Sequence, residues 1–270
     1  MKMGHGWRRS VLLLAVLATP AAAGALDRWE SGIINYDNDH NTPNEILHGI
    51  VQEGHDLEAN NGLPDNDWVV FRARARHSYE ARVGSGTMSW TYPGCTAFCA
   101  RFDRVDANGV ILTAGVPDGA SWVFEPTTLS VRWIASASGN EWLRVLGDTL
   151  FPASVTYDLV LYDTTYFAPR FNNSATQVTV LIVQNGTDEA VTGNVDFYNA
   201  AGSLLHAEPL SLAPQGVLVL NTAVLPGLAG QGGAVAIAHT GVYGALFGKA
   251  VALEPGTGFT FDTPLSPVPR

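Results

Sequence analysis

The chain of 270 residues is 46% apolar, which is enough to fill hydrophobic cores, and its 28 glycines and 15 prolines are typical of short strands joined by turns. Its 25 acidic residues outnumber the 15 basic ones and give a formal net charge of −10, which repels phosphate backbones and excludes nucleic acid as a partner. The length suits one large domain or two ordinary ones.

The first 25 residues have the form of a secretory signal peptide. Basic residues that include the Arg8-Arg9 pair precede a short apolar run at 11–18, and small residues follow, with cleavage expected after Ala23 or Ala25. The run is too short to span a bilayer, which takes about 20 residues, and we expect no transmembrane segment in the mature chain. The sequence therefore predicts a secreted protein (extracellular, periplasmic or at the cell surface), exported by the general or the twin-arginine route.

The opening segment of the mature chain, residues 26–65, is polar. Within it, Thr42-Pro43-Asn44-Glu45 has the form of a capping box, with proline at the first helical position. The motif predicts a single helical turn that ends before Gly49.

Two short runs after residue 67 alternate between apolar and polar residues, with the period of β-strands. We expect them to form a hairpin in which Ala75 pairs with Tyr79, because a slip by one residue would turn the apolar set to the other face. That register sets Arg74 opposite Glu80, a modest stabilising contact.

Further strands are expected at a spacing of about ten residues, separated by Gly, Pro and Asp, which is typical of a sandwich or barrel. They lie at residues 110–113, 121–124, 129–135, 142–146 and 155–162. A domain boundary is expected at 163–173, where the alternation is interrupted.

Beyond this boundary charge thins out, and near-continuous apolar runs predict strands buried on both faces at residues 178–183, 216–220, 234–238 and 246–253. Asn185-Gly186 predicts a turn of the hairpin type. The predicted fold is all-β, with two tandem antiparallel β-sandwich domains (jelly-roll or Ig-like) at 26–163 and 164–270, after the signal peptide at 1–25.

The first half carries a resemblance through two motifs, Thr42-Pro43-Asn44-Glu45 and Asp65-Asn66-Asp67-Trp68, the second at the entry to a strand. They are similar to the start of bacterial pre-peptidase C-terminal (PPC) domains, small β-sandwiches that trail secreted proteases and other exported proteins. The second half resembles C-terminal domains of large, uncharacterised secreted bacterial proteins, through residues 169–174, 218–222 and 248–255. These resemblances imply a binding or presentation module outside the cell, with no activity to carry over.

Cys95 and Cys99 are the only cysteines. In an exported chain we expect them to form a disulfide, because the compartment is oxidising, and closing so small a loop contributes about 2 kcal/mol. A redox motif has two intervening residues rather than three, and a structural zinc site needs further ligands.

Five acidic residues of the first half are the sharpest candidate for a site: Asp37, Asp39, Glu45, Asp65 and Asp67. Calcium takes six to eight oxygen ligands, and carboxylates with backbone carbonyls on a turn-rich segment supply them. The resemblance also implies calcium, since some relatives of the PPC family bind it at their opening segment. Solvated turns are the alternative, because the spacing is not that of an EF-hand and Asp and Asn are common turn residues.

Other candidates have a structural interpretation beside the functional one. His40, His48 and His55 lack the spacing of a metal site, and a hydrolase that uses His55 or His77 lacks the G-x-S-x-G motif around its serine. Several aromatic residues form either an exposed platform for sugar or peptide or part of a core: Trp68, Trp90, Tyr92, Trp122, Trp133 and Trp142. A stripe of three arginines is either solvated or docks an anionic partner: Arg72, Arg74 and Arg76.

The leading hypothesis is a non-catalytic secreted bacterial module that binds an extracellular protein, a polysaccharide or the cell surface, with calcium as a stabilising ion. The alternatives are a structural subunit of an extracellular or surface assembly and an unrecognised secreted hydrolase. A binding module predicts a concave or flat face with exposed aromatic rings, and a structural subunit predicts an uncovered apolar edge strand on the second domain. An enzyme predicts a deep polar pocket that holds His and acids with perturbed pKa values.

Overall fold

The computed structural model describes residues 39–57, 66–84, 100–117, 128–147, 155–174 and 176–269. These residues form strands in four antiparallel sheets and one 3-10 turn, η1 (Thr222–Val224), and there is no α-helix among them. The prediction of an all-β fold is therefore confirmed. The signal peptide and the strand expected at 121–124 lie outside the described residues.

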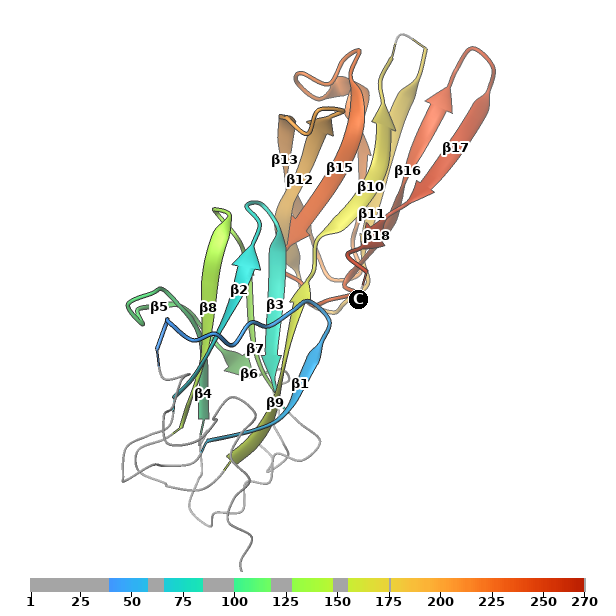
Figure 1. Ribbon diagram of the computed structural model, residues 1–270. Helices are drawn as coiled ribbons and strands as arrows, with labels where there is room; N and C mark the ends of the chain where they lie inside the picture. Colours follow the sequence, from blue (N-terminus) through green and yellow to red (C-terminus); the bar gives the residue numbers. More distant parts are fainter. Residues whose placement is uncertain are drawn as a thin grey trace, which may run out of the picture.

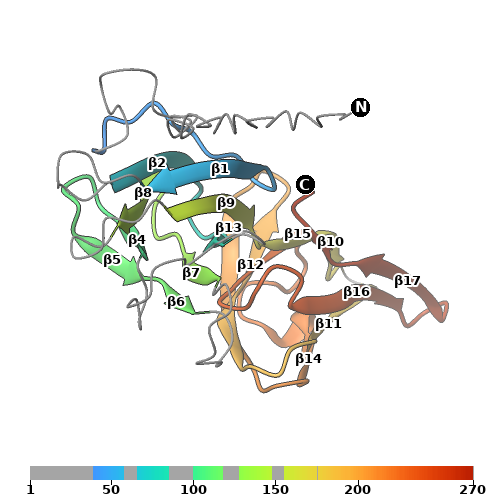
Figure 2. The ribbon, with the colours of Figure 1, turned by 90° about the horizontal axis from the view of Figure 1, so that it is seen from below.

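The N-terminal unit, residues 39–163, packs two sheets face to face (Figures 1 and 2). One sheet has the strand order β1-β9-β3-β7-β6 and the other β2-β8-β4-β5. The strands are β1 (Val51–Leu57), β2 (Asn66–Ala73), β3 (Ser78–Val83), β4 (Ala100–Val105), β5 (Ile111–Ala114), β6 (Val116–Pro117), β7 (Leu129–Ile134), β8 (Gly139–Gly147) and β9 (Val155–Asp163). Four of the expected strands thus correspond to β5, β7, β8 and β9.

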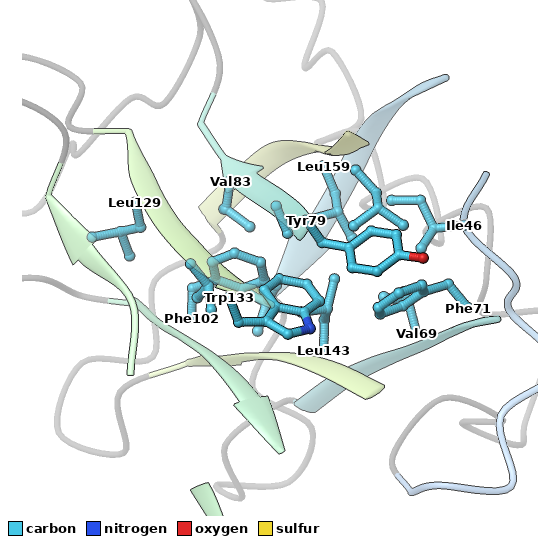
Figure 3. Packing of buried hydrophobic residues seen from close by; sticks show 14 of the residues in the cluster. Ile46, Val69, Phe71, Tyr79, Val83, Phe102, Leu129, Trp133, Leu143 and Leu159 are labelled. Atoms are coloured by element: carbon cyan, nitrogen blue, oxygen red, sulfur yellow. The ribbon is translucent and has the colours of Figure 1, made fainter. Parts of the chain in front are cut away.

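The core between these sheets is rich in aromatic rings (Figure 3). The ring of Phe71 on β2 lies 5.3 Å from that of Tyr79 on β3 and 5.7 Å from that of Trp133 on β7, measured between centroids. The Tyr79 hydroxyl accepts a hydrogen bond from the backbone N–H of Arg74 at 2.8 Å. Burial raises the pKa of Tyr79 to about 12, so the phenol remains neutral and its polar atom is satisfied inside the core.

The predicted hairpin between the first two alternating runs is wrong. β2 pairs with β8, whereas β3 pairs with β7 and β9 in the other sheet. The chain crosses between the sheets around Arg76, which has a φ of 65°. Phe71 and Tyr79 therefore meet across the core instead of lying on one sheet, and Glu80 has Arg132, not Arg74, as its cross-strand neighbour.

The helical turn expected in the opening segment does not form in the described residues. The Thr42 hydroxyl accepts the N–H of Asn44 at 3.1 Å, as a cap would. The backbone then forms an isolated parallel β-bridge between Glu45 and Val70. The next residue, Ile46, is buried, with 1% of its surface exposed. Burial of Ile46 against the core outweighs the local capping pattern.

The C-terminal unit, residues 166–269, holds a second hydrophobic cluster between two further sheets. Their strand orders are β13-β12-β15-β10-β18 and β14-β11-β16-β17. The strands are β10 (Tyr166–Asn172), β11 (Val178–Asn185), β12 (Val191–Asn199), β13 (Leu204–Leu212), β14 (Val217–Asn221), β15 (Gly232–His239), β16 (Leu246–Glu254), β17 (Phe259–Pro264) and β18 (Ser266–Pro267).

Three expectations for the second half are corrected. Asn185-Gly186 does not close a hairpin, because the chain leaves β11 for the other sheet, where β12 pairs with β13 and β15. β14 is not buried on both faces, since Val217 and Val219 are 56% and 63% exposed on an edge strand. The interruption expected at 163–173 contains strand β10.

Only Thr164 and Thr165 connect the two units, and both are fully buried. The Thr164 hydroxyl donates to Ser78 Oγ at 2.8 Å, and the Ser78 N–H donates to Thr165 Oγ1 at 3.0 Å. The end of the chain returns to this place (Figure 1), where the N–H of Val268 donates to the Thr165 carbonyl at 3.3 Å. The connection is thus part of the packed structure, and we call the region where the two units meet the joint.

Candidate functional site

The acidic residues predicted to bind calcium are only partly within the described structure. Asp39 and Glu45 are exposed, and Asp39 Oδ1 accepts the N–H of Asn41 at 2.7 Å, which is an Asx-turn. Asp67 is 1% exposed and accepts a hydrogen bond from the Tyr157 hydroxyl. No group of three His, Cys, Asp or Glu that could hold a metal ion occurs among the described residues.

Asp37 and Asp65, the other two predicted ligands, lie outside the described residues, so the calcium site stays a prediction. Cys95 and Cys99 also lie outside them, and the disulfide likewise stays a prediction.

The histidines of the opening segment lie in different surroundings. His40 is exposed beside the Trp142 ring, with 6.4 Å between centroids. His48 is at the joint, where its Nδ1 accepts the N–H of Asp163 at 2.8 Å. His55 is fully buried. The three side chains share no site within the described residues.

The described tryptophans do not form an exposed platform. Trp68 and Trp133 are each 6% exposed. The guanidinium of Arg144 lies 5.6 Å from the Trp68 ring centroid, and that of Arg104 lies 5.3 Å from the Trp133 ring centroid, so each is placed for a cation–π contact. Trp142 is half-buried, and Trp90, Tyr92 and Trp122 lie outside the described residues.

One member of the arginine stripe crosses the joint. Arg72 and Arg74 are exposed, whereas Arg76 forms a bidentate ion pair with Asp196 of β12, with Nε donating to Oδ2 at 2.7 Å and Nη2 donating to Oδ1. Asp196 is 1% exposed, and its hydrogen bond raises the pKa of the Arg76 guanidinium. A basic residue of the first half thus docks an anion, and the anion belongs to the same chain.

A second carboxylate holds the joint from the N-terminal side. Glu80 is fully buried; its Oε1 accepts from Arg132 Nε at 2.9 Å, and Arg82 Nη2 lies 3.0 Å from the same atom. Its Oε2 accepts the backbone N–H of Tyr243, on the loop between β15 and β16, at 2.8 Å. The Tyr243 ring stacks on Tyr162, with 4.9 Å between centroids. Glu80 is therefore shared by both units.

Histidines complete the joint. His77 Nδ1 lies 2.8 Å from Asp163 Oδ2. Although burial opposes ionisation, hydrogen bonds from His77 and Thr165 hold the pKa of Asp163 below its ordinary value. Burial lowers the pKa of His239 to about 4, so this ring, 5.6 Å from that of Tyr166, is neutral at pH 7.

A groove of about 560 Å³ lies on the outer face of the sheet that contains β10, β15 and β12. Its floor is made of small residues of β15, among them Ala234 and Ala236. Tyr198 of β12 stands opposite Ala234, and Phe167 of β10 stands opposite Ala236. At Gly233 a Cβ would lie 1.8 Å from the Tyr198 carbonyl oxygen, so only glycine permits this strand spacing. The result is a shallow trough with aromatic walls and an apolar floor.

Most polar side chains along the groove are already engaged. Asn172 donates to Gln177 Oε1 at 2.5 Å, and Asn199 Oδ1 accepts the N–H groups of Ala201 and Ser203, both at 2.9 Å. Burial and the nearby Asp196 carboxylate raise the pKa of Tyr198, which keeps its hydroxyl protonated.

Arg170, exposed on β10, is the charged side chain among the lining residues. A ligand in the groove therefore meets apolar surface, one cation and few hydrogen-bonding groups that are not already engaged.

Sequence reasoning missed the groove and the joint. The signal for the groove floor is Gly232-Gly233-Ala234-Val235-Ala236, a run of small residues that contains a single larger apolar residue. The walls come from β10 and β12, which no local pattern brings together.

No family model matches the chain, and no curated protein matches it. Within the described residues no helix has the length and apolar character to cross a membrane.

Proposed function

We propose that the chain is a non-catalytic secreted module that binds another protein outside the cell through the groove between β10 and β12. The groove supports this proposal because it combines a concave apolar floor with the rings of Tyr198 and Phe167, as binding sites on protein surfaces do. The proposed signal peptide and the resemblance to PPC domains agree with a module of this kind.

The lining favours protein over polysaccharide. Sugar hydroxyls need converging hydrogen-bond partners, and each hydroxyl left without one costs about 1–3 kcal/mol. The side-chain amide of Asn172 and the side-chain oxygen of Asn199 are already used within the unit. An apolar side chain of a protein, placed between the two aromatic walls, has no such requirement and loses water on both sides.

The charge at the groove indicates the neighbouring residue of the partner. Arg170 is exposed at the rim, whereas Asp196 is already paired with Arg76. We therefore expect a segment with an apolar or aromatic residue flanked by Asp or Glu, since a carboxylate beside Arg170 gains a charge-assisted hydrogen bond.

Panning a displayed peptide library on the folded chain tests the proposal. We expect enriched peptides of this composition, with at least about tenfold weaker binding to an Ala234→Arg variant, because a guanidinium on the floor fills the trough. A Val219→Arg variant, on the outer face of the other sheet, is the matched control and should bind normally. Peptides that bind Ala234→Arg unchanged, or polysaccharides that bind in a groove-dependent way while no peptide does, would overturn the proposal.

We further propose that Ca²⁺ and the Cys95–Cys99 disulfide stabilise the N-terminal unit. A ligand specific to the folded state must raise the melting temperature, by an amount that grows with its concentration. An equal melting temperature in excess calcium and in chelator would contradict the proposed role of calcium. A melting temperature that is unchanged after reduction would contradict the proposed role of the disulfide.

A further inference from the structure

The most exposed aromatic residues in the described structure are on the edge strand β17. Phe259 and Phe261 are 66% and 62% exposed. β17 ends the sheet β14-β11-β16-β17 and pairs only with β16 among the described strands. Its other edge has no strand beside it.

Both phenylalanines are on the face of the sheet that would normally be buried. Phe261 lies opposite Ala252 and Thr263 opposite Ala250, and Ala250 belongs to the core cluster, with 2% exposed. On the facing sheet the edge strand β18 is short and pairs only with Tyr166 and Phe167, and the exposure of both rings shows that the facing sheet leaves them largely uncovered. In Figure 1 β17 is the outermost strand of the unit, and in Figure 2 the β16–β17 hairpin projects away from the other strands.

The first part of β17, which carries the two rings, lacks the features that usually protect an edge strand; the charge and the proline of this strand, Asp262 and Pro264, come after it. The neighbouring edge on the facing sheet carries Pro169, Arg170 and a bulge between Ala168 and Phe171, which are devices against strand pairing. The stretch from Phe259 to Phe261 has no proline, charge or bulge.

We propose that two copies of the chain pair antiparallel through their β17 edges, about a two-fold axis at Thr260. In this register Phe259 lies opposite Phe261 of the second copy and Thr260 lies opposite its own counterpart. Both aromatic pairs then fall on the same face, because antiparallel partners share a face and a shift by one residue would separate them. A two-fold interface requires such a self-complementary patch.

The edge is self-complementary, since Phe259 and Phe261 flank Thr260 and a second copy offers each ring a matching ring, and local charge does not oppose this pairing. Two chains with a net charge of −10 repel each other, so they associate best where no unpaired acid faces the contact. The paired segment is neutral, and the adjoining Asp262 is bound by Lys249, with Nζ 2.5 Å from Oδ2. A basic partner finds no uncompensated acid in this segment. This inference goes beyond the proposed binding function and does not depend on the groove.

The dimer should be weak. One pair of short strands and four rings bury less than the roughly 1,200–2,000 Å² of stable interfaces, so we expect a dissociation constant on the order of 10 µM or above.

Sedimentation velocity tests the proposal. The protein concentration is varied from about 1 to about 300 µM, which brackets the expected dissociation constant. We expect a monomer–dimer equilibrium that a Phe259→Ser/Phe261→Ser variant weakens at least about tenfold. A Val217→Ser/Val219→Ser variant, altered at the opposite edge of the same sheet, should dimerise normally. Circular dichroism checks that each variant is folded.

The register has its own test. A Thr260→Cys variant should give a covalent dimer on mild oxidation, because the two-fold axis brings the two thiols together. A Thr263→Cys variant should give no more covalent dimer than the wild-type chain does. A monomer at all concentrations, or a dimer indifferent to the phenylalanine substitutions, would overturn the proposal. A ladder of larger oligomers that the valine variant suppresses would show pairing of β17 with β14 instead.

Discussion

The joint and the free hairpin of β16 and β17 are two surfaces that the fold treats in opposite ways. At the joint, ionisable groups such as Glu80 and Asp196 are buried, and each has several partners. At the hairpin, Phe259 and Phe261 are 66% and 62% exposed. Burying charge requires that every partner be in place, so the joint has one arrangement, whereas exposed apolar surface remains available to a partner. The difference separates a surface that holds the molecule together from one that is free to interact.

Glu80→Ala should give the largest loss of stability. It leaves Arg132, which is 18% exposed, and the N–H of Tyr243 without their shared acceptor, and we expect about 3 kcal/mol of destabilisation in urea unfolding. Glu189→Ala is the matched control, because Glu189 contacts the same Arg132 at 3.8 Å but is 80% exposed. The control should cost below about 0.5 kcal/mol. Equal effects would mean that burial does not distinguish the joint.

Acid should weaken the joint before it affects the hairpin. His239, with its pKa lowered to about 4, remains neutral in the folded protein, whereas the unfolded chain takes up a proton below about pH 6.5. Stability is therefore full above pH 6.5 and falls as pH decreases toward 4, by roughly 2–3 kcal/mol. The lowered pKa of Asp163 adds a further loss below its ordinary value of 3.8.

Urea unfolding at several pH values measures this dependence. A His239→Gln variant keeps an acceptor for the Gly241 N–H but does not titrate, so its profile should be flatter between pH 6.5 and 4. An unchanged slope in that variant would assign the acid loss to other groups.

The ion pair between Arg76 and Asp196 should contribute less, because Arg76 is 38% exposed and solvent screens the pair. We expect a coupling energy of about 1–2 kcal/mol from a double-mutant cycle of Arg76→Ala and Asp196→Asn. Arg76→Gly should be less destabilising than Arg76→Ala by about 1 kcal/mol, because glycine adopts the φ of 65° without strain. A coupling energy near zero would mean that the ion pair of Arg76 does not stabilise the joint.

Phe261→Ala should have the smallest effect on stability, below about 0.5 kcal/mol at a protein concentration that keeps the chain monomeric. The same change at the fully buried Phe197 should cost about 3–5 kcal/mol. Thermal or urea unfolding measures both. A large loss at Phe261 would show that the hairpin serves the fold itself.

Period-two alternation and apolar runs predicted strands such as β7, β8, β9 and β11 but not their neighbours, and they gave no prediction for β1, β4, β12, β13 or β17. The run ending at residue 162 predicted β9 almost to its bounds, because alternate residues such as Leu159 and Leu161 face one core. The same rule misplaced β2 and β3, since Phe71 and Tyr79 satisfy it equally on one sheet or across a sandwich. Only the pairing of each strand with distant partners distinguishes the two cases.

The functional surfaces were harder to predict for a related reason. Arg76 and Asp196 are 120 positions apart in the chain. Each belongs to an alternating strand or turn in which a charged residue ordinarily faces water, and no local feature shows that the other covers it. The exposed rings of β17 look like core residues in the sequence, because they alternate as core residues do. No local feature shows that the facing sheet, whose edge strand β18 is only two residues long, leaves them uncovered.

The C-terminal unit ends beside the place where it begins, and this has a consequence for protein engineering. Thr165 enters the C-terminal unit and Val268 leaves it, and the two are joined by a backbone hydrogen bond of 3.3 Å. A unit whose two ends meet can be transplanted as a cassette into a surface loop of another protein without stretching its host. The groove and the β17 edge would travel with it, so each could be displayed on a neutral scaffold, apart from the N-terminal unit.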